Sequence, residues 1–296
     1  MNLTQLIQQG ADQLDQAKVA FGHGTLNAHD EAAWLTLWQL KMPLDLEISD
    51  ALQISAQDVA ACEALIQQRI ETRKPAAYLT NEAWLQGIPF YVDERSIVPR
   101  SFIAELIVDG AFDAWLSPSS HDFLDLCTGN GSLAVICAMA YPDISVVGAD
   151  ISTQALAVAK INVDKHQLAD RIQLVQSDGL REVDGLFDCI VCNPPYVCQA
   201  SMATLPDEFR AEPTLALAGG QDGMDFVRQL FLDLPMRMND KAILVLEIGN
   251  EREHFETAFP TLEAVWLETS AGEDQVLLIS REALLKNHKE KLGVIE

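Results

Sequence analysis

Apolar side chains recur along the first 75 residues at the three- and four-residue spacing of amphipathic helices. The recurrence covers residues 3–19, 32–40 and 59–70, and each segment would bury one face. Ser55 precedes the third segment and is a favourable N-cap. Loops containing glycine or proline separate the segments. We therefore predict a small helical bundle over residues 1–75.

The pattern changes over residues 76–98. Aromatic and β-branched residues at 77–79 and 90–92 flank Gly87 and Pro89. Such runs on either side of turn-forming residues are typical of a β-hairpin. We predict that this hairpin links the helical bundle to the rest of the chain.

From residue 123 onward, short apolar runs alternate with helical segments, which predicts an α/β fold with a mostly parallel sheet and helices on both faces. Together with a helix over 101–115, this makes residues 99–296 one domain. The charged tail from Lys286 is predicted to be frayed. The predicted strands are 123–127, 145–149, 172–175, 187–192, 242–247, 264–267 and 275–279, and the helices among them include 132–140 and 153–166.

The most informative motif is Asn193-Pro194-Pro195-Tyr196, directly after the predicted strand 187–192. Asn193 offers a side-chain carbonyl, and Pro194 has a C=O but no N–H. Two neighbouring acceptors suit a planar nitrogen that carries two hydrogens, and Tyr196 adds an apolar face. The motif favours a site for an amide NH₂ or a nucleobase amine, although a rigid turn with a capping Asn would use the same residues.

A glycine loop supplies the other half of a candidate site. The run from Asp125 to Ser132 follows the first strand and opens a helix, and its Gly129 and Gly131 let the backbone turn tightly and approach a ligand. The third glycine of the dinucleotide fingerprint is absent, with Ala134 at that offset. The loop therefore suits a ligand with a ribose and an amino-acid tail better than a pyrophosphate.

Acidic residues follow the next two strands. Asp150 ends strand 145–149, where a carboxylate can accept hydrogen bonds from both ribose hydroxyls. Asp178 and Gly179 follow strand 172–175, where a carboxylate can meet an adenine amine. Each acid alone could be a helix cap or a loop acceptor. Because ligands of such sheets bind at the carboxyl ends of the strands, three acids there favour a shared cofactor site.

Composition and charge restrict the partners. Of the 296 residues 49% are hydrophobic, and the formal net charge is −24. The chain is therefore expected to form a sizeable core, and its surface should repel duplex nucleic acid and attract a basic protein. No apolar run reaches the length of a membrane span, and the amino terminus does not read as a signal peptide, so we expect a cytoplasmic protein with no membrane contact.

Six cysteines suggest free thiols in a reducing compartment. Cys189 and Cys192 form a CxxC, but no second ligand pair matches it, and residues three apart in a strand point to opposite faces. We therefore predict no metal site. The cysteines are Cys62, Cys127, Cys137, Cys189, Cys192 and Cys198.

The loop at 125–131, then Asp150, Asp178 and the 193–196 motif occur in the order typical of S-adenosylmethionine-dependent methyltransferases of the NPPY class. Further strings extend a resemblance to bacterial protein-(glutamine-N5) methyltransferases over nearly the whole chain. This resemblance implies a Rossmann-like methyltransferase sheet behind a helical substrate-recognition domain. The further strings are at 76–84, 90–95, 98–101, 212–213, 216–217 and 220–223.

That family has two main bacterial branches, which differ in substrate. The strings at 78–84 and 91–95 resemble the branch that methylates a glutamine of large-subunit ribosomal protein L-three. The sequence at 99–104 departs from the P-R-P-E-T-E of the branch that methylates the GGQ glutamine of peptide-chain release factors. A basic ribosomal protein is the expected substrate, and a release factor is the runner-up.

The resemblance implies that Asn193 and the Pro194 carbonyl grip the glutamine amide while Tyr196 packs against it. S-adenosyl-L-methionine is the expected cofactor, leaving as S-adenosyl-L-homocysteine. Gly179 stands where some relatives carry an aromatic, which leaves adenine stacking open. Substrate binding is assigned to Asn193, Pro194, Pro195 and Tyr196, and cofactor binding to Asp125, Cys127, Thr128, Gly129, Asn130, Gly131, Asp150, Ile151, Asp178, Gly179 and Asn193.

The sequence leaves several interpretations of the function open. An adenine-amine methyltransferase on nucleic acid would use the same motif on a flipped base, although the net charge opposes it. A third hypothesis is a non-catalytic adenosine-binding module that assists ribosome assembly. Glu247 either orients the Asn193 loop or caps a strand. Arg100 either pairs with an acid of the hairpin, which we favour, or lines the substrate cleft.

Overall fold

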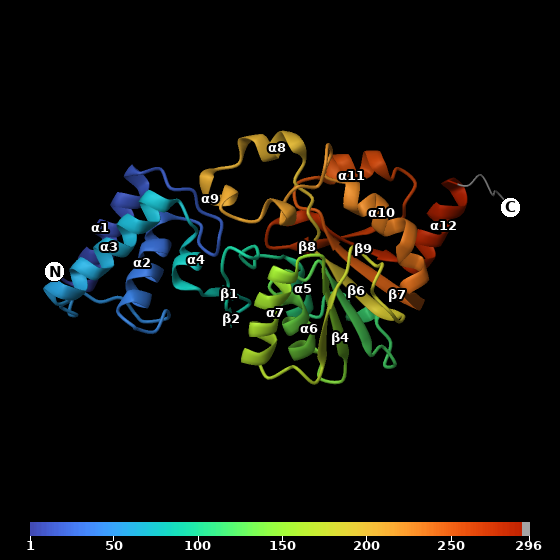
Figure 1. Cartoon of the computed structure of the whole chain (residues 1–296), viewed down its shortest axis with the longest axis horizontal. Coiled ribbons are helices and arrows are strands. Elements are labelled where there is room, and N and C mark those ends of the chain that lie inside the picture. Colours follow the sequence, from blue (N-terminus) through green and yellow to red (C-terminus); the bar gives the residue numbers. More distant parts are fainter. Residues whose placement is uncertain (292–296) are drawn as a thin grey trace.

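The computed structural model describes residues 1–291 as an elongated molecule with a helical bundle at one end and a large α/β body at the other (Figure 1). The body is built on a seven-stranded sheet in the order β5-β4-β3-β6-β7-β9-β8 within the described residues. No helix of this part of the chain is long and apolar enough to cross a membrane.

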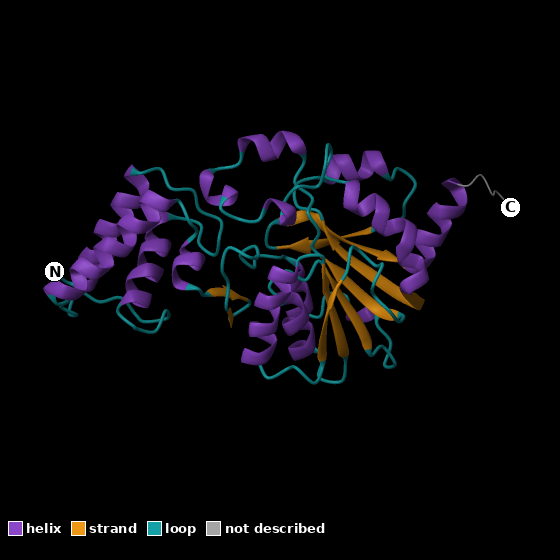
Figure 2. Ribbon diagram, in the orientation of Figure 1, coloured by secondary structure: helices purple, strands orange, loops and turns teal. Residues whose placement is uncertain are grey.

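Five neighbouring strands of the sheet are parallel, and β9 pairs antiparallel with both β7 and β8. The expected α/β fold is thereby confirmed. The sheet fans out between two layers of helices (Figure 2). Its strands are β3 (Asp122–Leu126), β4 (Ser145–Asp150), β5 (Ile172–Gln176), β6 (Phe187–Cys192), β7 (Met238–Glu247), β8 (Val265–Thr269) and β9 (Gly272–Ser280).

Alternation along each strand divides the interior into two cores, one on each face of the sheet. Phe123 and Val191 pack into one core, whereas Leu124 and Ile190 pack into the other. Cys189 and Cys192 likewise enter different cores, as their spacing in a strand predicts. Both cysteines are free thiols.

Helices α5, α6 and α7 cover the first face, and α10, α11 and α12 cover the second (Figure 1). Helix α6 is almost entirely buried because it packs between the sheet and its neighbours, which explains its continuous apolar sequence. The bounds are α5 (Ile103–Val108), α6 (Ser132–Ala140), α7 (Thr153–Lys165), α10 (Asp225–Asp233), α11 (Arg252–Ala258) and α12 (Arg281–Lys291), with a 3₁₀ turn at Leu234–Arg237 before β7.

The amino-terminal bundle consists of α1 (Leu3–Gln16), α2 (Ala28–Gln39) and α3 (Ala56–Thr72) around their own apolar core. Ser55 caps α3 by accepting the Asp58 N–H, as its position predicts. The helices occupy the segments that the apolar spacing marked. Where one folding domain ends and the next begins stays a prediction.

Residues 76–98 differ in part from the predicted hairpin. Ala76–Thr80 forms a short helix, α4, where we expected the first strand. The hairpin itself is smaller and pairs β1 (Ala83–Leu85) with β2 (Ile88–Phe90). The misassignment has a physical cause: Pro75 opens the helix, and the Tyr78 hydroxyl is held by the Ser96 carbonyl, a contact 18 residues away.

Two further expectations need correction. The helix predicted over residues 101–115 ends at Val108 and is followed by a separate 3₁₀ turn at Asp113–Trp115. The tail predicted to fray from Lys286 is helical as far as Lys291. Asn287 explains this order, because its side chain is buried and donates to the Thr261 hydroxyl. The last five residues of that predicted tail lie outside the described part.

A long connection after β6 returns over the carboxyl edge of the sheet and reaches the amino-terminal bundle. It contains α8 (Gln199–Thr204), α9 (Asp207–Arg210) and a 3₁₀ turn at Thr214–Ala216. In Figure 1 it arches between the bundle and the body. We call residues 198–218 the cover segment.

Buried charges join the cover segment to the bundle. Arg69 is fully buried in α3 and donates to Glu31 of α2 at 2.8 Å and to Glu208 of α9 at 3.4 Å. Arg73 also reaches Glu208, at 3.3 Å. Because each buried charge has an opposite partner, the contact fixes the bundle against the cover segment without leaving a lone charge out of water.

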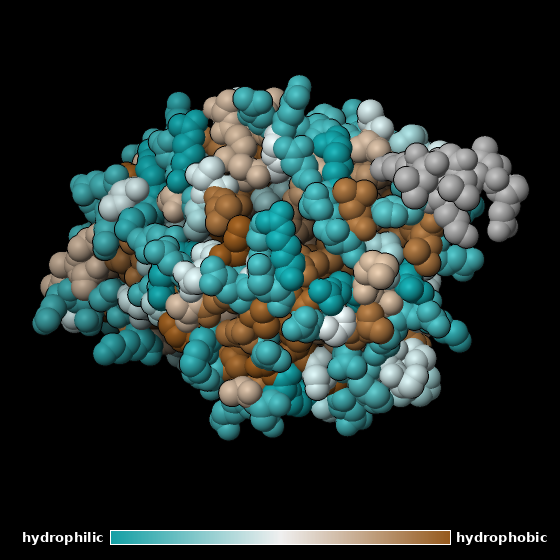
Figure 3. Space-filling model, turned by 45° about the vertical axis from the view of Figure 1, so that its right-hand side comes forward, coloured by the Kyte–Doolittle hydropathy of each residue, from teal (hydrophilic) through white to brown (hydrophobic). Residues whose placement is uncertain are grey.

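The outer surface is mostly hydrophilic, and hydrophobic residues gather in the middle and lower part of the face that Figure 3 shows. The buried side chains follow the expected apolar positions, whereas the acidic residues lie largely outside. This distribution agrees with the high negative charge of the chain.

Replacing Arg69 with Met should lower the free energy of unfolding by about 3–5 kcal/mol, because Glu31 and Glu208 would lose their buried partner. Urea denaturation followed by circular dichroism measures the loss. Arg210→Met is the matched control, since the exposed Arg210 pairs with the exposed Asp207 and donates to the Ala203 carbonyl. It should change stability by less than about 1 kcal/mol. An equal loss of unfolding free energy in the two variants would contradict a stabilising role for the buried Arg69 contacts between the bundle and the cover segment.

Candidate active site

The carboxyl ends of β3, β4, β5 and β6 surround a cavity of about 230 Å³. Parallel strands bring their carboxyl ends to one edge of the sheet, so residues distant in sequence meet there. The cover segment closes the far side through Pro213, Leu215 and Ala216. The remaining lining residues are Arg95, Ser96, Ile97, Leu126, Cys127, Gly129, Ala149, Asp150, Ile151, Ser152, Ala155, Ser177, Asp178, Gly179, Asn193, Pro195 and Phe226.

The loop between β3 and α6 requires its glycines. Gly131 has a φ of 79°, and a Cβ there would lie 3.0 Å from the Cβ of Ala159 in α7. Gly129 also has a positive φ, of 56°, and faces the cavity. The backbone can therefore come close both to the neighbouring helix and to a guest, which side chains at these positions would prevent.

Asp125 is buried beneath this loop and holds it. One carboxylate oxygen accepts from the Thr128 hydroxyl and from the Ala134 N–H, the latter at 2.9 Å. The other oxygen, Oδ1, has no hydrogen-bond partner among the described residues. Burial raises the pKa of this carboxyl to about 7, although the hydrogen bonds oppose the shift. The unpaired oxygen lies behind the loop and not in the cavity lining, so it suits an ordered water.

Asp150 ties the first two strand ends together. Its carboxylate accepts from the Gly129 N–H at 2.9 Å and from the Ser152 N–H at 2.8 Å. Burial raises the pKa of Asp150, and the backbone donors oppose the rise. The carboxylate lines the cavity beside Ile151, so it can meet hydroxyl groups of a guest there.

The third strand end is more open. Asp178 lines the cavity but also pairs with Arg181, and both side chains are exposed. A Cβ on Gly179 would meet nothing within 4 Å, so the space of a larger side chain is free. Phe226 at the start of α10 lines the same cavity. The ring of Phe226 therefore reaches the cavity from α10. No motif in the sequence had marked Phe226 as a site residue.

The 193–196 motif follows β6 directly. Asn193 and Pro195 line the cavity, and the Asn193 side chain makes no hydrogen bond within residues 1–291. Pro194 is buried, and Tyr196 is half-buried directly after Pro195. The amide of Asn193 is thus held at the cavity by a stiff backbone while its polar atoms stay available.

Tyr196 sits in a cradle of three glycines. A Cβ on Gly249 would lie 2.5 Å from the ring of Tyr196, and one on Gly219 would lie 2.7 Å from its Cα. A Cβ on Gly223 would overlap the Tyr196 carbonyl oxygen. Only glycine allows the three chain segments to approach the motif so closely, and together they fix its position.

Glu247 connects the motif to the rest of the body. It accepts from the Ser101 hydroxyl at 2.6 Å, from the Phe102 N–H at 2.9 Å and from the Tyr196 hydroxyl at 3.4 Å. Burial raises the pKa of Glu247 to about 6, and the Ser101 hydrogen bond opposes the rise. The contact with Tyr196 favours an orienting role over that of a strand cap.

Arg100 pairs with Glu212 of the cover segment and not with an acid of the hairpin, which corrects our expectation. The guanidinium donates to both carboxylate oxygens, at 2.6 and 2.7 Å. The Val98 N–H donates to the same carboxylate, and His23 Nε2 lies 3.4 Å from it. Burial alone would raise the pKa of Glu212, but Arg100 and His23 lower it to about 2.

The predicted cofactor residues fall into two groups. The first group lines the cavity and consists of Cys127, Gly129, Asp150, Ile151, Asp178, Gly179 and Asn193. The second group shapes the loop from behind and consists of Asp125, Thr128, Asn130 and Gly131. The sequence signal, a position at or just after the carboxyl end of a strand, marks both groups alike and does not distinguish contact from support.

Comparison with known proteins shows which family the chain resembles. Residues 111–245 match the family model described as methyltransferase small domain. A ribosomal protein uL3 glutamine methyltransferase of Bordetella pertussis is 47% identical and covers 95% of this chain and 96% of its own length. The protein of the same name in Neisseria gonorrhoeae is 44% identical over 95% of this chain and 94% of its own length.

Solved structures support the fold. A methyltransferase from Pyrococcus furiosus covers 73% of this chain and 97% of its own, with a TM-score of 0.50 and 18% identity. The hMettl16 catalytic domain in complex with the MAT2A 3′UTR hairpin 6 covers 80% and 85%, with a TM-score of 0.51 and 12% identity. At such low identity these likenesses concern the Rossmann-like architecture alone.

Asp125→Asn should flatten the dependence of stability on pH. The folded protein keeps a proton on Asp125 up to about pH 7, whereas the unfolded chain releases it near pH 4. This carboxyl therefore stabilises the fold below pH 4, and its contribution is lost as the pH rises to 7. Removing it should reduce that loss by about 2–4 kcal/mol.

Denaturation midpoints at pH 4, 5, 6 and 7 measure the slope. Asn keeps the acceptor for Thr128 and Ala134 and places an NH₂ at the unpaired position, so the variant should fold. Asp122→Asn, at the exposed start of the same strand, is the control and should keep the wild-type slope. A slope unchanged by Asp125→Asn would contradict the raised pKa.

Proposed function

This chain belongs to the ribosomal protein uL3 glutamine methyltransferase family, and we propose that it methylates the side-chain amide nitrogen (N5) of a glutamine in uL3, the large-subunit ribosomal protein L-three. Identity of 44–47% over about 95% of the chain supports the same activity. The observation that carries the chemistry is the unpaired Asn193 amide, fixed at the cavity that Gly129 and Asp150 also line.

The cavity residues fit S-adenosyl-L-methionine. Asp150 would meet the ribose hydroxyls, and the loop at 127–131 would face the amino-acid tail. Ile151 and Phe226 provide apolar surface for the adenine where Gly179 offers none. The unpaired Oδ1 of Asp125, behind the loop, suits an ordered water. When bound, this cofactor supplies a methyl group already activated on a sulfonium.

Asn193 and Pro194 would perform the orientation step. An amide nitrogen is a weak nucleophile, since its lone pair is delocalised into the carbonyl. The side-chain oxygen of Asn193 and the carbonyl of Pro194 would each accept one N–H of the glutamine amide. That grip aligns the nitrogen and favours the positive charge that develops on it, an effect of about 7–11 kcal/mol in favourable cases.

Tyr196 would pack against the glutamine side chain while Glu247 and the glycine cradle hold it in place. No strong base is needed before transfer, because the methylated amide can release its proton to water afterwards. The nearby acidic residues therefore serve to hold other groups in place. Asp125 and Glu247 fix loops and are not assigned to proton abstraction.

Charge supports a basic protein as the substrate. A net charge of −24 attracts a cationic partner and repels a phosphate backbone. The helical bundle lies beside the cover segment, so a substrate that contacts the bundle would be presented to the cavity edge. We propose that the protein acts in the cytoplasm, where ribosomal proteins are made.

Asn193→Ala should reduce the rate of methyl transfer by roughly 10²–10³-fold, because an acceptor aimed at the developing charge is lost. Cofactor affinity, measured by calorimetry, should stay near that of the wild type. Asn239→Ala, at the opposite end of the sheet, is the matched control and should retain activity. Unchanged turnover in Asn193→Ala would remove the proposed role.

The substrate can be identified with cofactor carrying a tritiated methyl group. We expect label in purified uL3 and little in release factors or in nucleic acid. Mass spectrometry of ribosomal proteins and release factors from a deletion strain should show the loss of one methyl group from a uL3 glutamine. Label confined to a release factor or to nucleic acid would overturn the proposed substrate.

A further inference from the structure

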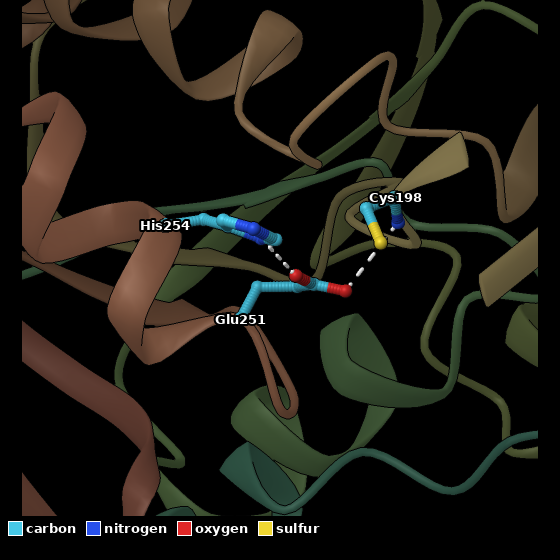
Figure 4. A group of neighbouring side chains, drawn as sticks. All are labelled: Cys198, Glu251 and His254. Atoms are coloured by element: carbon cyan, nitrogen blue, oxygen red, sulfur yellow. Dashed lines mark hydrogen bonds and ion pairs between the residues drawn. The ribbon is translucent and has the colours of Figure 1, made fainter. Parts of the chain in front are cut away.

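Three side chains with different donor atoms meet outside the cofactor cavity. They are Cys198 at the start of α8, Glu251 before α11 and His254 in its first turn, and Glu251 lies between the other two (Figure 4). The ligand atoms, one from each residue, lie within 4.8 Å of one another. Other residues line the described cavity, so this group is separate from the cofactor site.

The backbone already fixes two of the three residues. Next to Cys198, the Val197 N–H donates to the Leu217 carbonyl at 2.8 Å and the Val197 carbonyl accepts from the Gly219 N–H at 2.9 Å. The Glu251 N–H donates to the Ile248 carbonyl at 3.2 Å. Cys198 and Glu251 are 6% and 9% exposed, whereas the His254 side chain is 47% exposed. The group thus has a rigid buried side and a side open to solvent.

The hydrogen-bond contacts of the Glu251 side chain are with the other two residues of the group. Its Oε2 lies 2.5 Å from His254 Nδ1, and its Oε1 accepts from the Cys198 N–H at a long 3.4 Å. The Cys198 sulfur lies 3.4 Å from the Ser201 hydroxyl. No lysine or arginine is within ion-pair distance of Glu251 among the described residues.

We propose that Cys198, Glu251 and His254 form a binding site for a divalent transition-metal ion, with zinc as the best fit. Sulfur, imidazole nitrogen and carboxylate oxygen are the ligands that zinc prefers, and three of them leave a fourth position for water. Magnesium and calcium favour all-oxygen sets, so they fit poorly. This inference goes beyond the proposed methyl transfer and does not rest on it.

The geometry requires only a small adjustment. Zinc bonds of about 2.0–2.3 Å place tetrahedral ligand atoms about 3.3–3.8 Å apart. The Glu251–His254 contact would therefore open by about 1 Å, which the exposed histidine permits, while the sulfur moves slightly inward. On binding, the Cys198 thiol releases its proton to water and neutral His254 offers Nδ1, so metal affinity should rise with pH.

A metal here would join two loops that hold the catalytic motif. Cys198 is two residues after Tyr196, and Glu251 is two residues after Gly249, whose backbone packs on the Tyr196 ring. The Glu251 side chain also contacts the Gly223 turn, where a Cβ would come within 3.3 Å of its Cγ. The ion would therefore act as a structural cross-link and would stay away from the reacting atoms.

Zinc binding by the full chain tests the proposal. Protein freed of metal by dialysis against a chelator is titrated with zinc in competition with a chromophoric indicator. We expect one tight equivalent per chain and an increase in the melting temperature with zinc. Cys198→Ser and His254→Ala should each weaken binding by roughly 100-fold or more, since second-sphere changes alone cost 10–100-fold.

Cobalt provides a spectroscopic signature. The wild-type chain with cobalt should show a thiolate-to-metal charge-transfer band that Cys198→Ser lacks. Cys62→Ala and His29→Ala remove a cysteine and a histidine far from the group, so they should keep both the band and the affinity. If the wild type binds no tight equivalent, or Cys198→Ser binds like the wild type, the group is an ordinary ion pair and the proposal is wrong.

Discussion

One buried carboxylate, that of Glu212, holds together the parts that make the site. It receives a bidentate pair from Arg100 and the Val98 N–H, with His23 of the bundle alongside. Glu212 belongs to the cover segment, whereas its partners come from the bundle and from the chain at the end of the hairpin region, both far away in sequence. Since a buried anion without such partners is strongly unfavourable, this contact stabilises the three segments in their relative positions.

The fold and the two halves of the site follow from local pattern. Strands such as 187–192 are short apolar runs, and parallel pairing then forces Asp125, Asp150 and Asn193 to one edge. What could not be predicted depends on contacts between distant segments. Ala76–Thr80 is helical because Pro75 precedes its first turn and the Ser96 carbonyl accepts a hydrogen bond from Tyr78. Its own sequence would suit a strand equally well.

The same limit applies to the site. Phe226 reaches the cavity because α10 packs on the second core, and only the packed structure reveals this. Glu212, the partner of Arg100, is 112 residues away in sequence, so the sequence favoured the nearer acids of the hairpin. Some predicted cofactor residues line the cavity, and others shape its loop. Which of the two a residue does depends on the direction of its side chain, and the amino-acid type alone does not give that direction.

The cradle around Tyr196 has a consequence for engineering acceptor range. Its walls are the backbone at Gly219, Gly223 and Gly249, and glycine has no side chain left to trim. A pocket whose walls are already minimal cannot be widened by point substitution at those walls. A side chain at any of these walls would instead displace Tyr196 and the motif that carries Asn193, so a change in acceptor range would have to come from residues outside the cradle.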